Sequence, residues 1–117
     1  MHVPAVPVRD AILNLLLNAC HVSREGGSVE LRAYVRDGQF AAEISDEGDG
    51  LAAHMREYLE RKGAGAAPLD RRSGLGLWIV KRHCDELHAR LAVVQSGKSG
   101  TVLRFIIPLM EETGRAA

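Results

Sequence analysis

The sequence predicts a two-layer α+β sandwich in which three helices pack on one face of a mainly antiparallel sheet. Apolar residues recur at helical spacing in three separate segments, and two pairs of strand-like segments lie between them. The resulting order is helix, two strands, helix, loop, helix, two strands. Such an order favours helices segregated on one face of an antiparallel sheet. Whether the sheet has four strands or a fifth short one remains open at this level.

The first predicted helix spans residues 8–22 and has a polar edge beside its core face. Both stripes follow the helical period of 3.6 residues. The core face consists of Ile12, Leu15, Leu16 and Ala19. The adjoining polar stripe consists of Asn14, Asn18 and His21.

A β-hairpin is predicted next. Residues 28–36 alternate between apolar and polar side chains, which indicates a half-buried strand with Val29, Leu31, Ala33 and Val35 facing inward. Asp37-Gly38 is a favoured pair for a two-residue turn, because both of its positions need positive φ. The strand at 39–46 should therefore return antiparallel.

The second half of the chain predicts two helices and a second hairpin. Residues 52–62 form a short helix with Met55 and Leu59 inward, and residues 63–68 form a loop rich in glycine and alanine that we expect to be mobile. A third helix at 74–89 carries the apolar positions Leu77, Val80, Cys84 and Leu87. The last strands, 90–96 and 101–108, are joined across 97–100.

Size and charge indicate one compact domain spanning residues 1–117. A content of 46% hydrophobic residues is enough for one core, and fifteen Lys and Arg balance fifteen Asp and Glu. No overall field would hold the chain on nucleic acid or on a membrane surface, so any polyanion needs a local site. Cys20 and Cys84 have no CxxC spacing, which favours reduced thiols. No membrane span or secretion signal is visible, so we expect a cytoplasmic domain.

Three glycine-bearing segments are candidates for a binding site: 46–50 (Asp-Glu-Gly-Asp-Gly), 73–77 (Ser-Gly-Leu-Gly-Leu) and 97–101 (Gly-Lys-Ser-Gly-Thr). Each alone is weak evidence, because glycine pairs usually mark turns. Asp46 ends a strand, where an aspartate either caps the turn or accepts a hydrogen bond from an exocyclic amine such as that of adenine. The segment 73–77 opens a helix, where free N–H groups and the helix dipole suit a phosphate chain. Neither a Walker loop nor a dinucleotide fingerprint fits it.

Asn14 and Asn18 lie four residues apart and therefore share one helix face. Their ordinary interpretation is a solvated helix edge. An amide oxygen can also complete the oxygen shell of Mg²⁺, which takes few protein ligands and the rest from phosphate and water. Asn18 is the candidate for that role.

In order and spacing these motifs resemble those of histidine kinase catalytic domains. The resemblance rests on 14–19 (Asn-Leu-Leu-Leu-Asn-Ala), Asp46-x-Gly-x-Gly50, 73–80 and Gly100-Thr101 with a closing Pro108, and it covers about residues 8–109. The wider superfamily, GHKL, includes type II topoisomerases, heat-shock chaperone ATPases, MutL proteins and anti-sigma-factor kinases. The resemblance implies the Bergerat ATP-binding fold, with helices on a mixed, mainly antiparallel sheet. It makes 63–73 the ATP lid and 110–117 a tail.

The resemblance also implies roles for individual residues. Asp46 would bind the adenine amine, and Asn18 would hold Mg²⁺. Asn14 would support the phosphates, and His21 would reach them. Gly74 and Gly76 would let the lid close, and Thr101 would lie at the floor of the adenine pocket. The implied nucleotide-binding set is Asn14, Asn18, His21, Asp46, Gly48, Gly50, Arg72, Ser73, Gly74, Leu75, Gly76, Leu77 and Thr101, with Asn14 and Asn18 as catalytic residues.

One position bears on whether ATP is hydrolysed by water or its γ-phosphoryl group is transferred to a histidine. In hydrolysing relatives, a glutamate four residues before the metal-binding asparagine can orient or deprotonate a nucleophile. That position is Asn14 here, and a neutral amide cannot act as a general base. Attack by water is therefore disfavoured, and transfer to a histidine imidazole is the better interpretation.

The sequence departs from the family pattern in three places. Arg72 stands where a further glycine is usual, so it either stiffens the lid or contacts phosphate. The lid lacks a clear Phe-x-Pro-Phe segment, and Tyr58-Leu59 is the nearest apolar pair. No histidine heads a phosphoacceptor motif H-[ED]-x-x-x-P, so the acceptor histidine must lie on another domain.

The sequence thus predicts the Mg²⁺- and ATP-dependent catalytic domain of a two-component sensor histidine kinase. Its expected partners are ATP, the dimerisation and phosphoacceptor domain of the same kinase and, through the full-length kinase, a response regulator. The full-length kinase is free to carry a membrane anchor. Two alternatives remain: a GHKL-type ATPase, and a nucleotide-sensing domain with little transfer activity.

Overall fold

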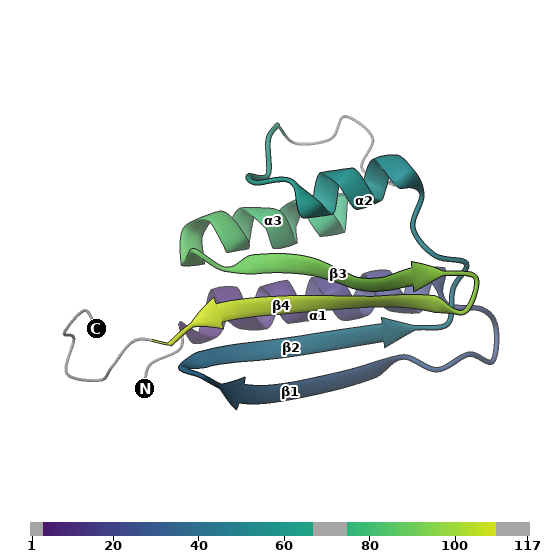
Figure 1. The fold of residues 1–117 in the computed structure, drawn as a ribbon, viewed down its shortest axis with the longest axis horizontal. Coiled ribbons are helices and arrows are strands. Elements are labelled where there is room, and N and C mark those ends of the chain that lie inside the picture. The colour runs from purple at the N-terminus through teal and green to yellow at the C-terminus, as the bar shows by residue number, and fades with distance from the viewer. Residues whose placement is uncertain (1–3, 67–74, 110–117) are drawn as a thin grey trace.

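The computed structural model describes residues 4–66 and 75–109 and contains helices and strands in the predicted order (Figure 1). The helices are α1 (Ala5–Val22), α2 (Ala53–Glu60) and α3 (Leu75–Leu87). The strands are β1 (Glu30–Arg36), β2 (Gln39–Asp46), β3 (Arg90–Gly97) and β4 (Gly100–Pro108).

The four strands form one sheet in the order β1-β2-β4-β3, and every neighbouring pair is antiparallel. The register between β2 and β4 pairs Asp46 with Thr101 and Gln39 with Pro108. β2 and β4 therefore lie at the centre, with β1 and β3 at the edges. The β2–β4 pairing joins the two hairpins and brings Asp46 beside Thr101.

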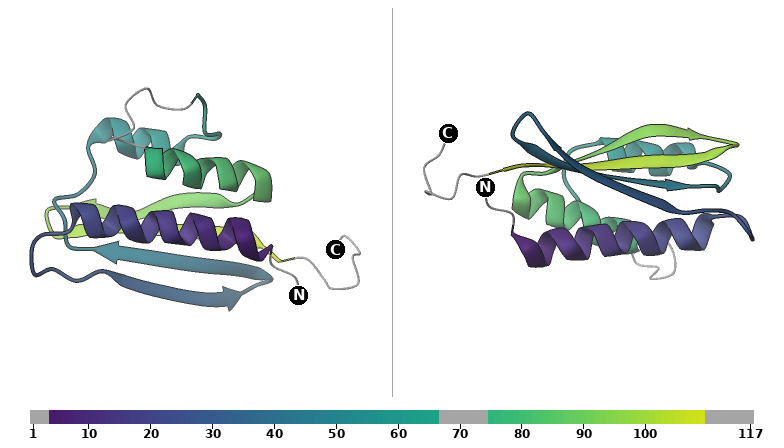
Figure 2. Two further views of the ribbon diagram at one scale, coloured as in Figure 1. Left: turned by 180° about the vertical axis from the view of Figure 1, so that it is seen from behind. Right: turned by 90° about the horizontal axis from the view of Figure 1, so that it is seen from below.

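The helices and the sheet form two layers, as predicted. α1 and α3 lie on one face of the sheet, and α2 lies beside β3 (Figure 2). The core is the space between the layers, where Phe105 and Val80 have no exposed surface and Leu15 and Leu59 have 1%. Cys84 and Leu77 pack in the same cluster, which confirms the predicted inner face of α3.

α1 begins at Ala5, three residues before the predicted start. Pro7 lies in its first turn, where a proline is tolerated because the missing N–H would have had no partner within the helix. The polar stripe is retained, since Asn14 and Asn18 are half-buried and His21 is exposed.

The prediction that the first strand is half-buried is wrong. The alternation does place Leu31 and Val35 on the helix side, opposite Ile44 and Phe40 of β2. Both remain exposed, at 47% and 55%, because β1 is an edge strand beyond the area that α1 covers. Alternation reports which side chains share a face, but whether a helix covers that face depends on the strand's place in the sheet.

Residues with positive φ form the turn between β1 and β2 and end α3. Asp37 and Gly38 have φ values of 53° and 73°, as the predicted two-residue turn requires. α3 ends at Leu87, two residues before the predicted end, because His88 adopts φ 56° and the N–H of Ala89 donates to the carbonyl of Cys84. Among the described helices, none has the length and apolarity needed to cross a membrane.

Core and edge positions should respond very differently to truncation. Phe105→Ala removes a ring that has no exposed surface, and we expect it to lower the free energy of unfolding by about 3–5 kcal/mol. Val35→Ala on β1 is the matched control, with an expected change within about 0.5 kcal/mol. Denaturant unfolding of both variants measures the difference. Equal losses would show that β1 is covered in solution.

Candidate functional site

Two of the three glycine-bearing segments meet at one end of the sheet. Gly100 precedes Thr101 at the start of β4, beside the end of β2. A Cβ atom on Gly100 would lie 2.0 Å from the carbonyl oxygen of Asp46, and Gly100 has φ 126°. Only a glycine fits both constraints. The turn 97–100 is therefore packed directly on the backbone where segment 46–50 begins.

The segment 46–50 is enclosed on two further sides. A Cβ atom on Gly48 would lie 2.5 Å from the carbonyl oxygen of Val22, at the end of α1. A Cβ atom on Gly50, which has φ 91°, would lie 2.9 Å from the backbone nitrogen of Gly97. These close approaches fix the segment between α1 and the β3–β4 turn. Gly48 and Gly50 thus have the structural role that a turn around a ligand requires.

The Asp46 carboxylate has the first of the two roles that the sequence left open, the cap of the turn. Its Oδ1 accepts a hydrogen bond of 2.8 Å from the N–H of Gly48, so Asp46 does cap the turn. A carboxylate has two oxygen atoms, and Oδ2 accepts no hydrogen bond within the described part of the chain. Asp46 is half-buried, and the neighbouring Thr101 is 4% exposed. Oδ2 is therefore free to accept a bond from a ligand amine.

The amide group of Asn14 on α1 lies near the start of α3. The Asn14 Nδ2 atom donates to the carbonyl of Asp10 at 2.8 Å, and its Oδ1 lies 3.8 Å from the position that a Cβ atom on Gly76 would take. The Asn14 side chain is thus in ordinary contact range of Gly76. Asn18 lies one turn further along α1, and its side-chain amide makes no hydrogen bond to the residues that the structure describes. The structure therefore brings Asn14 and Gly76 together and leaves the Asn18 amide available.

Other predicted site residues fall into three groups. His21 is exposed near the end of α1. Leu75 is half-buried, whereas Leu77 is 3% exposed and packs in the hydrophobic core. Arg72, Ser73 and Gly74 lie outside the described residues.

Arg24 and Ser23 are structural residues of the site that the sequence analysis missed. The Arg24 guanidinium donates to three carbonyls, those of Glu47 (3.2 Å), Gly48 (3.3 Å) and Lys98 (2.6 Å). It therefore joins segment 46–50 to the β3–β4 turn. The Ser23 Oγ accepts from the N–H of Glu47. No local motif distinguishes these residues, because their partners are backbone carbonyls far away in the sequence.

Ser96 is a third missed residue. Its Oγ accepts a 2.7 Å hydrogen bond from the N–H of Leu51 and lies 3.4 Å from the Thr101 Oγ1. It thus holds the far end of segment 46–50 against β3. Serine in a strand beside a turn gives no signal of such a role in the sequence.

The loop that leads into residues 67–74 begins from a fixed position. Trp78 donates to the carbonyl of Gly65, and Asp85 accepts from the N–H of Ala64. Ala64 is 3% exposed, and the Lys81 ammonium donates to the carbonyls of Tyr58 and Arg61. Part of the loop that its composition predicts to be mobile, Ala64–Gly65, is therefore bonded to α3. Leu59, one of the apolar pair at the expected lid, is in the core.

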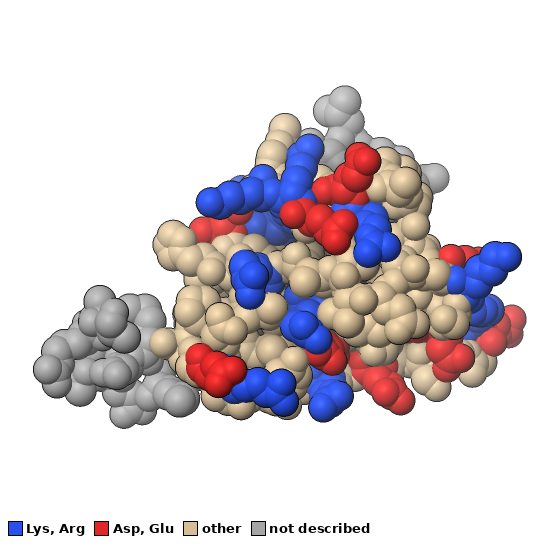
Figure 3. Space-filling model, viewed as in Figure 1, with Lys and Arg blue, Asp and Glu red and all other residues tan. Residues whose placement is uncertain are grey.

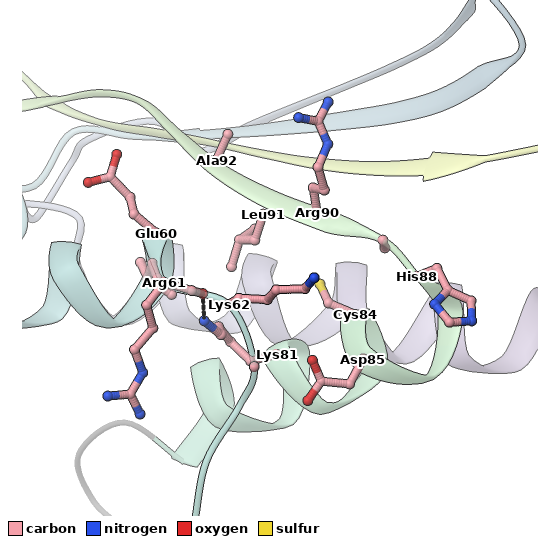
Figure 4. A pocket seen from close by; sticks show the side chains of 13 residues that line it. Glu60, Arg61, Lys62, Lys81, Cys84, Asp85, His88, Arg90, Leu91 and Ala92 are labelled. Atoms are coloured by element: carbon pink, nitrogen blue, oxygen red, sulfur yellow. Dashed lines mark hydrogen bonds between the residues drawn. The ribbon is translucent and has the colours of Figure 1, made fainter.

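A cavity lined by described residues lies away from this end of the sheet. It has a volume of about 690 Å³ and lies between Lys62, the second half of α3 and the start of β3 (Figure 4). Cys84 lines it, about 12 Å along α3 from Gly76 at 1.5 Å per residue. Burial raises the pKa of the Cys84 thiol to about 12, so the thiol stays protonated near neutral pH. None of the predicted site residues lines this cavity.

The donor set at the glycine-bearing end is compatible with magnesium. Across residues 4–66 and 75–109, no three His, Cys, Asp or Glu side chains converge as a metal cluster. A Mg²⁺ ion held beside Asn18 would take the amide oxygen as a protein ligand and its other ligands from phosphate and water. That arrangement matches the preference of Mg²⁺ for oxygen and for retained water.

Gly100→Ala should disturb this end of the molecule far more than Gly97→Ala. The Gly100 variant forces a Cβ atom onto the Asp46 carbonyl and adopts an unfavourable φ, so we expect a loss of about 2 kcal/mol or more in the free energy of unfolding. A Cβ atom at Gly97 meets nothing within 4 Å. Denaturant unfolding measures both. A Gly100 variant as stable as the wild type would contradict the close packing described above.

Comparisons with known proteins agree with this arrangement. Residues 4–111 match the model of the family described as histidine kinase-, DNA gyrase B-, and HSP90-like ATPase. Relatives include the sensor protein KdpD of Clostridium acetobutylicum, 29% identical over 86% of this chain, and the histidine protein kinase DivJ of Caulobacter vibrioides, 30% identical over 88%. The chain spans 12% and 18% of those two proteins.

Solved structures show the same fold. The mycobacterial sensor histidine kinase MprB superposes with a TM-score of 0.67 at 30% identity, covering 87% of this chain and 72% of that one. Full-length ShkA in complex with AMPPNP superposes with a TM-score of 0.72 at 27% identity, covering 95% and 22%. The chain therefore belongs to the family of histidine kinase-, DNA gyrase B- and HSP90-like ATPases, as an ATP-binding catalytic domain of the histidine kinase type.

Proposed function

We propose that this domain binds Mg²⁺-ATP at its glycine-bearing end and transfers the γ-phosphoryl group to a histidine on a separate helical domain. The observation that carries the proposal is the convergence at one end of the fold. Asp46 and Thr101 lie beside each other, the Asn18 amide makes no hydrogen bond to a described residue, and Asn14 lies near Gly76 at the start of α3. These groups come from four parts of the chain: α1, β2, α3 and β4.

Each group has a chemical role in holding the nucleotide. The free Oδ2 of Asp46 accepts the exocyclic amine of adenine, beside the buried Thr101. The start of α3 offers backbone N–H groups and a positive dipole to the phosphates, and His21 and Arg72 would add charge there. Asn18 would hold Mg²⁺, which neutralises phosphate charge and orients the transferred group. Catalysis in this arrangement is mainly positioning and charge neutralisation.

The surroundings of Asn14 favour transfer over hydrolysis. Its amide cannot take a proton from water, and its Nδ2 is already bonded to the carbonyl of Asp10. The nearby acid Glu47 is engaged as well, because its Oε1 accepts from the N–H of Ser28. That hydrogen bond lowers the pKa of Glu47 and makes it a weaker base. A nucleophile that needs little activation, such as a neutral imidazole, fits this site better than water.

The phosphoryl acceptor belongs to another domain in this proposal. No histidine of the chain heads a phosphoacceptor motif, and the chain spans 12–29% of the length of its four curated relatives. The full kinase would supply the helical acceptor domain, and the phosphoryl group would then pass to a response regulator aspartate. Similarity to KdpD, DivJ and MprB supports this assignment over a GHKL-type ATPase.

Nucleotide binding should depend on Asp46 and Asn18. Saturating Mg²⁺-AMPPNP at about 100 times its dissociation constant should stabilise the wild type by roughly 2.7 kcal/mol. Asp46→Asn removes an amine acceptor and Asn18→Ala removes the metal ligand, so each should lose most of that stabilisation. Denaturant unfolding with and without Mg²⁺-AMPPNP measures the effect.

Asp49→Asn and Leu17→Ala are matched controls, because both residues are exposed and adjoin the two sites. Each should retain the wild-type response. If saturating Mg²⁺-AMPPNP did not stabilise the wild type, nucleotide binding itself would be refuted.

Transfer should require the acceptor domain. Incubation with ATP labelled at the γ-phosphate should label histidine on an added helical acceptor domain, and the chain alone should stay unlabelled. The product should be acid-labile, as expected for phosphohistidine. Rapid ATP turnover by this chain alone would favour the ATPase, and nucleotide binding without transfer to any supplied acceptor would favour a sensing domain.

A further inference from the structure

The face of the sheet opposite the helices carries four arginines. The register places Arg32, Arg36, Arg90 and Arg104 on this face, which Figure 3 shows with Lys and Arg in blue. No described helix covers it, since α1 and α3 lie on the other face. The chain as a whole has no net charge, so the arginines are a local concentration rather than part of a general excess.

Three of these four arginines line a hollow in the sheet surface. It has a volume of about 240 Å³ and is lined by Arg36, Arg90 and Arg104 together with Tyr34, Asp37, Gln39, Ala41 and Ile106. Ala41 and Ile106 form an apolar floor and are only 5% and 9% exposed. The volume suits a single inserted side chain rather than a metabolite, since small-molecule sites usually exceed about 300 Å³.

The walls of the hollow are fixed before any partner arrives. The Arg104 Nε donates to the Glu43 Oε2 at 2.7 Å, and the Tyr34 hydroxyl donates to the same oxygen at 2.9 Å. Arg32 and Arg36 each lie over the Tyr34 ring, at 5.7 Å from its centroid. Arginines held by stacking and hydrogen bonds lose less conformational entropy on binding than free ones.

The charges on this face favour an anion. The register places four guanidinium groups on this face with the carboxylates of Glu30 and Glu43, and Asp37 of the hairpin turn is the third acid beside them. Hydrogen bonding to Arg104 lowers the pKa of Glu43, so Glu43 stays ionised and offsets Arg104. Across the described residues, no carboxylate lies within ion-pairing distance of Arg32, Arg36 or Arg90. Their donors are available to a partner.

We propose that this outer face is a docking surface for an acidic protein segment, with a carboxylate of that segment inserted between Arg36 and Arg90. Guanidinium groups bind carboxylates through paired hydrogen bonds, and the apolar floor accepts the methylene stem of a glutamate. Asp37 and Glu43 interrupt the basic surface, which argues against the continuous stripe that a nucleic acid backbone requires. Complementary charge of this kind mainly sets orientation and association rate.

The test measures binding of fluorescent decaglutamate to the chain at low ionic strength by anisotropy, with decaglutamine as the neutral counterpart. We expect binding of decaglutamate only, weakened as salt increases because the charges are exposed. Arg36→Gln combined with Arg90→Gln should weaken it about tenfold or more. Both residues are exposed, so the variant should remain folded.

The control is Arg9→Gln combined with Arg56→Gln, which removes the same charge from exposed positions on α1 and α2. If this control variant binds decaglutamate with an affinity within about twofold of the wild type, the result supports the surface on the sheet. If both double variants lost the same affinity for decaglutamate, net charge alone would explain the effect, and the proposal would be overturned. Tighter binding of duplex DNA or of phosphatidylserine vesicles than of decaglutamate would overturn it in favour of those partners.

Discussion

The close approach of Gly100 to the carbonyl of Asp46 is the contact on which the nucleotide end of this domain depends. It removes any space for a side chain between the end of β2 and the start of β4. As a result, the carboxylate of one strand and the buried hydroxyl of the next lie at a fixed separation, whatever the loops beyond them do. Gly48 against Val22 and Gly50 against Gly97 extend the same principle to α1 and to the neighbouring turn. A site assembled by backbone contact has little freedom to relax.

Polar side chains complete this frame by bonding to backbone atoms. The Arg24 guanidinium joins two turns from outside, and Ser96 does so from the sheet. Their partners are main-chain groups that would otherwise be satisfied by water, so these bonds fix position more than they add stability. The Asp46 Oδ2 atom and the Asn18 amide are not among the groups that make these structural bonds. Within the described residues, Asp46 uses one oxygen for the turn and the other accepts no hydrogen bond, and the Asn18 amide makes none.

Much of the fold follows from local pattern, because its determinants are local. The Asp37-Gly38 turn and the inner face of α3 need only residues that are neighbours in sequence. The burial of β1 could not be predicted in this way: Leu31 and Val35 alternate like core residues, yet their exposure is decided by which strand occupies the edge. The same reason explains why the sequence predicts a role for Asp46 in the site but not for Arg24. Asp46 belongs to a motif with fixed spacing, whereas Arg24 acts on carbonyls up to 74 residues away.

The described residues on either side of 67–74 are anchored by different means. Before them, Trp78 and Asp85 of α3 bond to the backbone of Gly65 and Ala64. After them, Gly76 lies against Asn14 of α1, on the polar stripe proposed to hold phosphate and metal. The described residues before 67–74 are therefore held to α3, and those after it lie against α1. Lys81 adds to the first anchor, because it ties the end of α2 to α3 through the carbonyls of Tyr58 and Arg61.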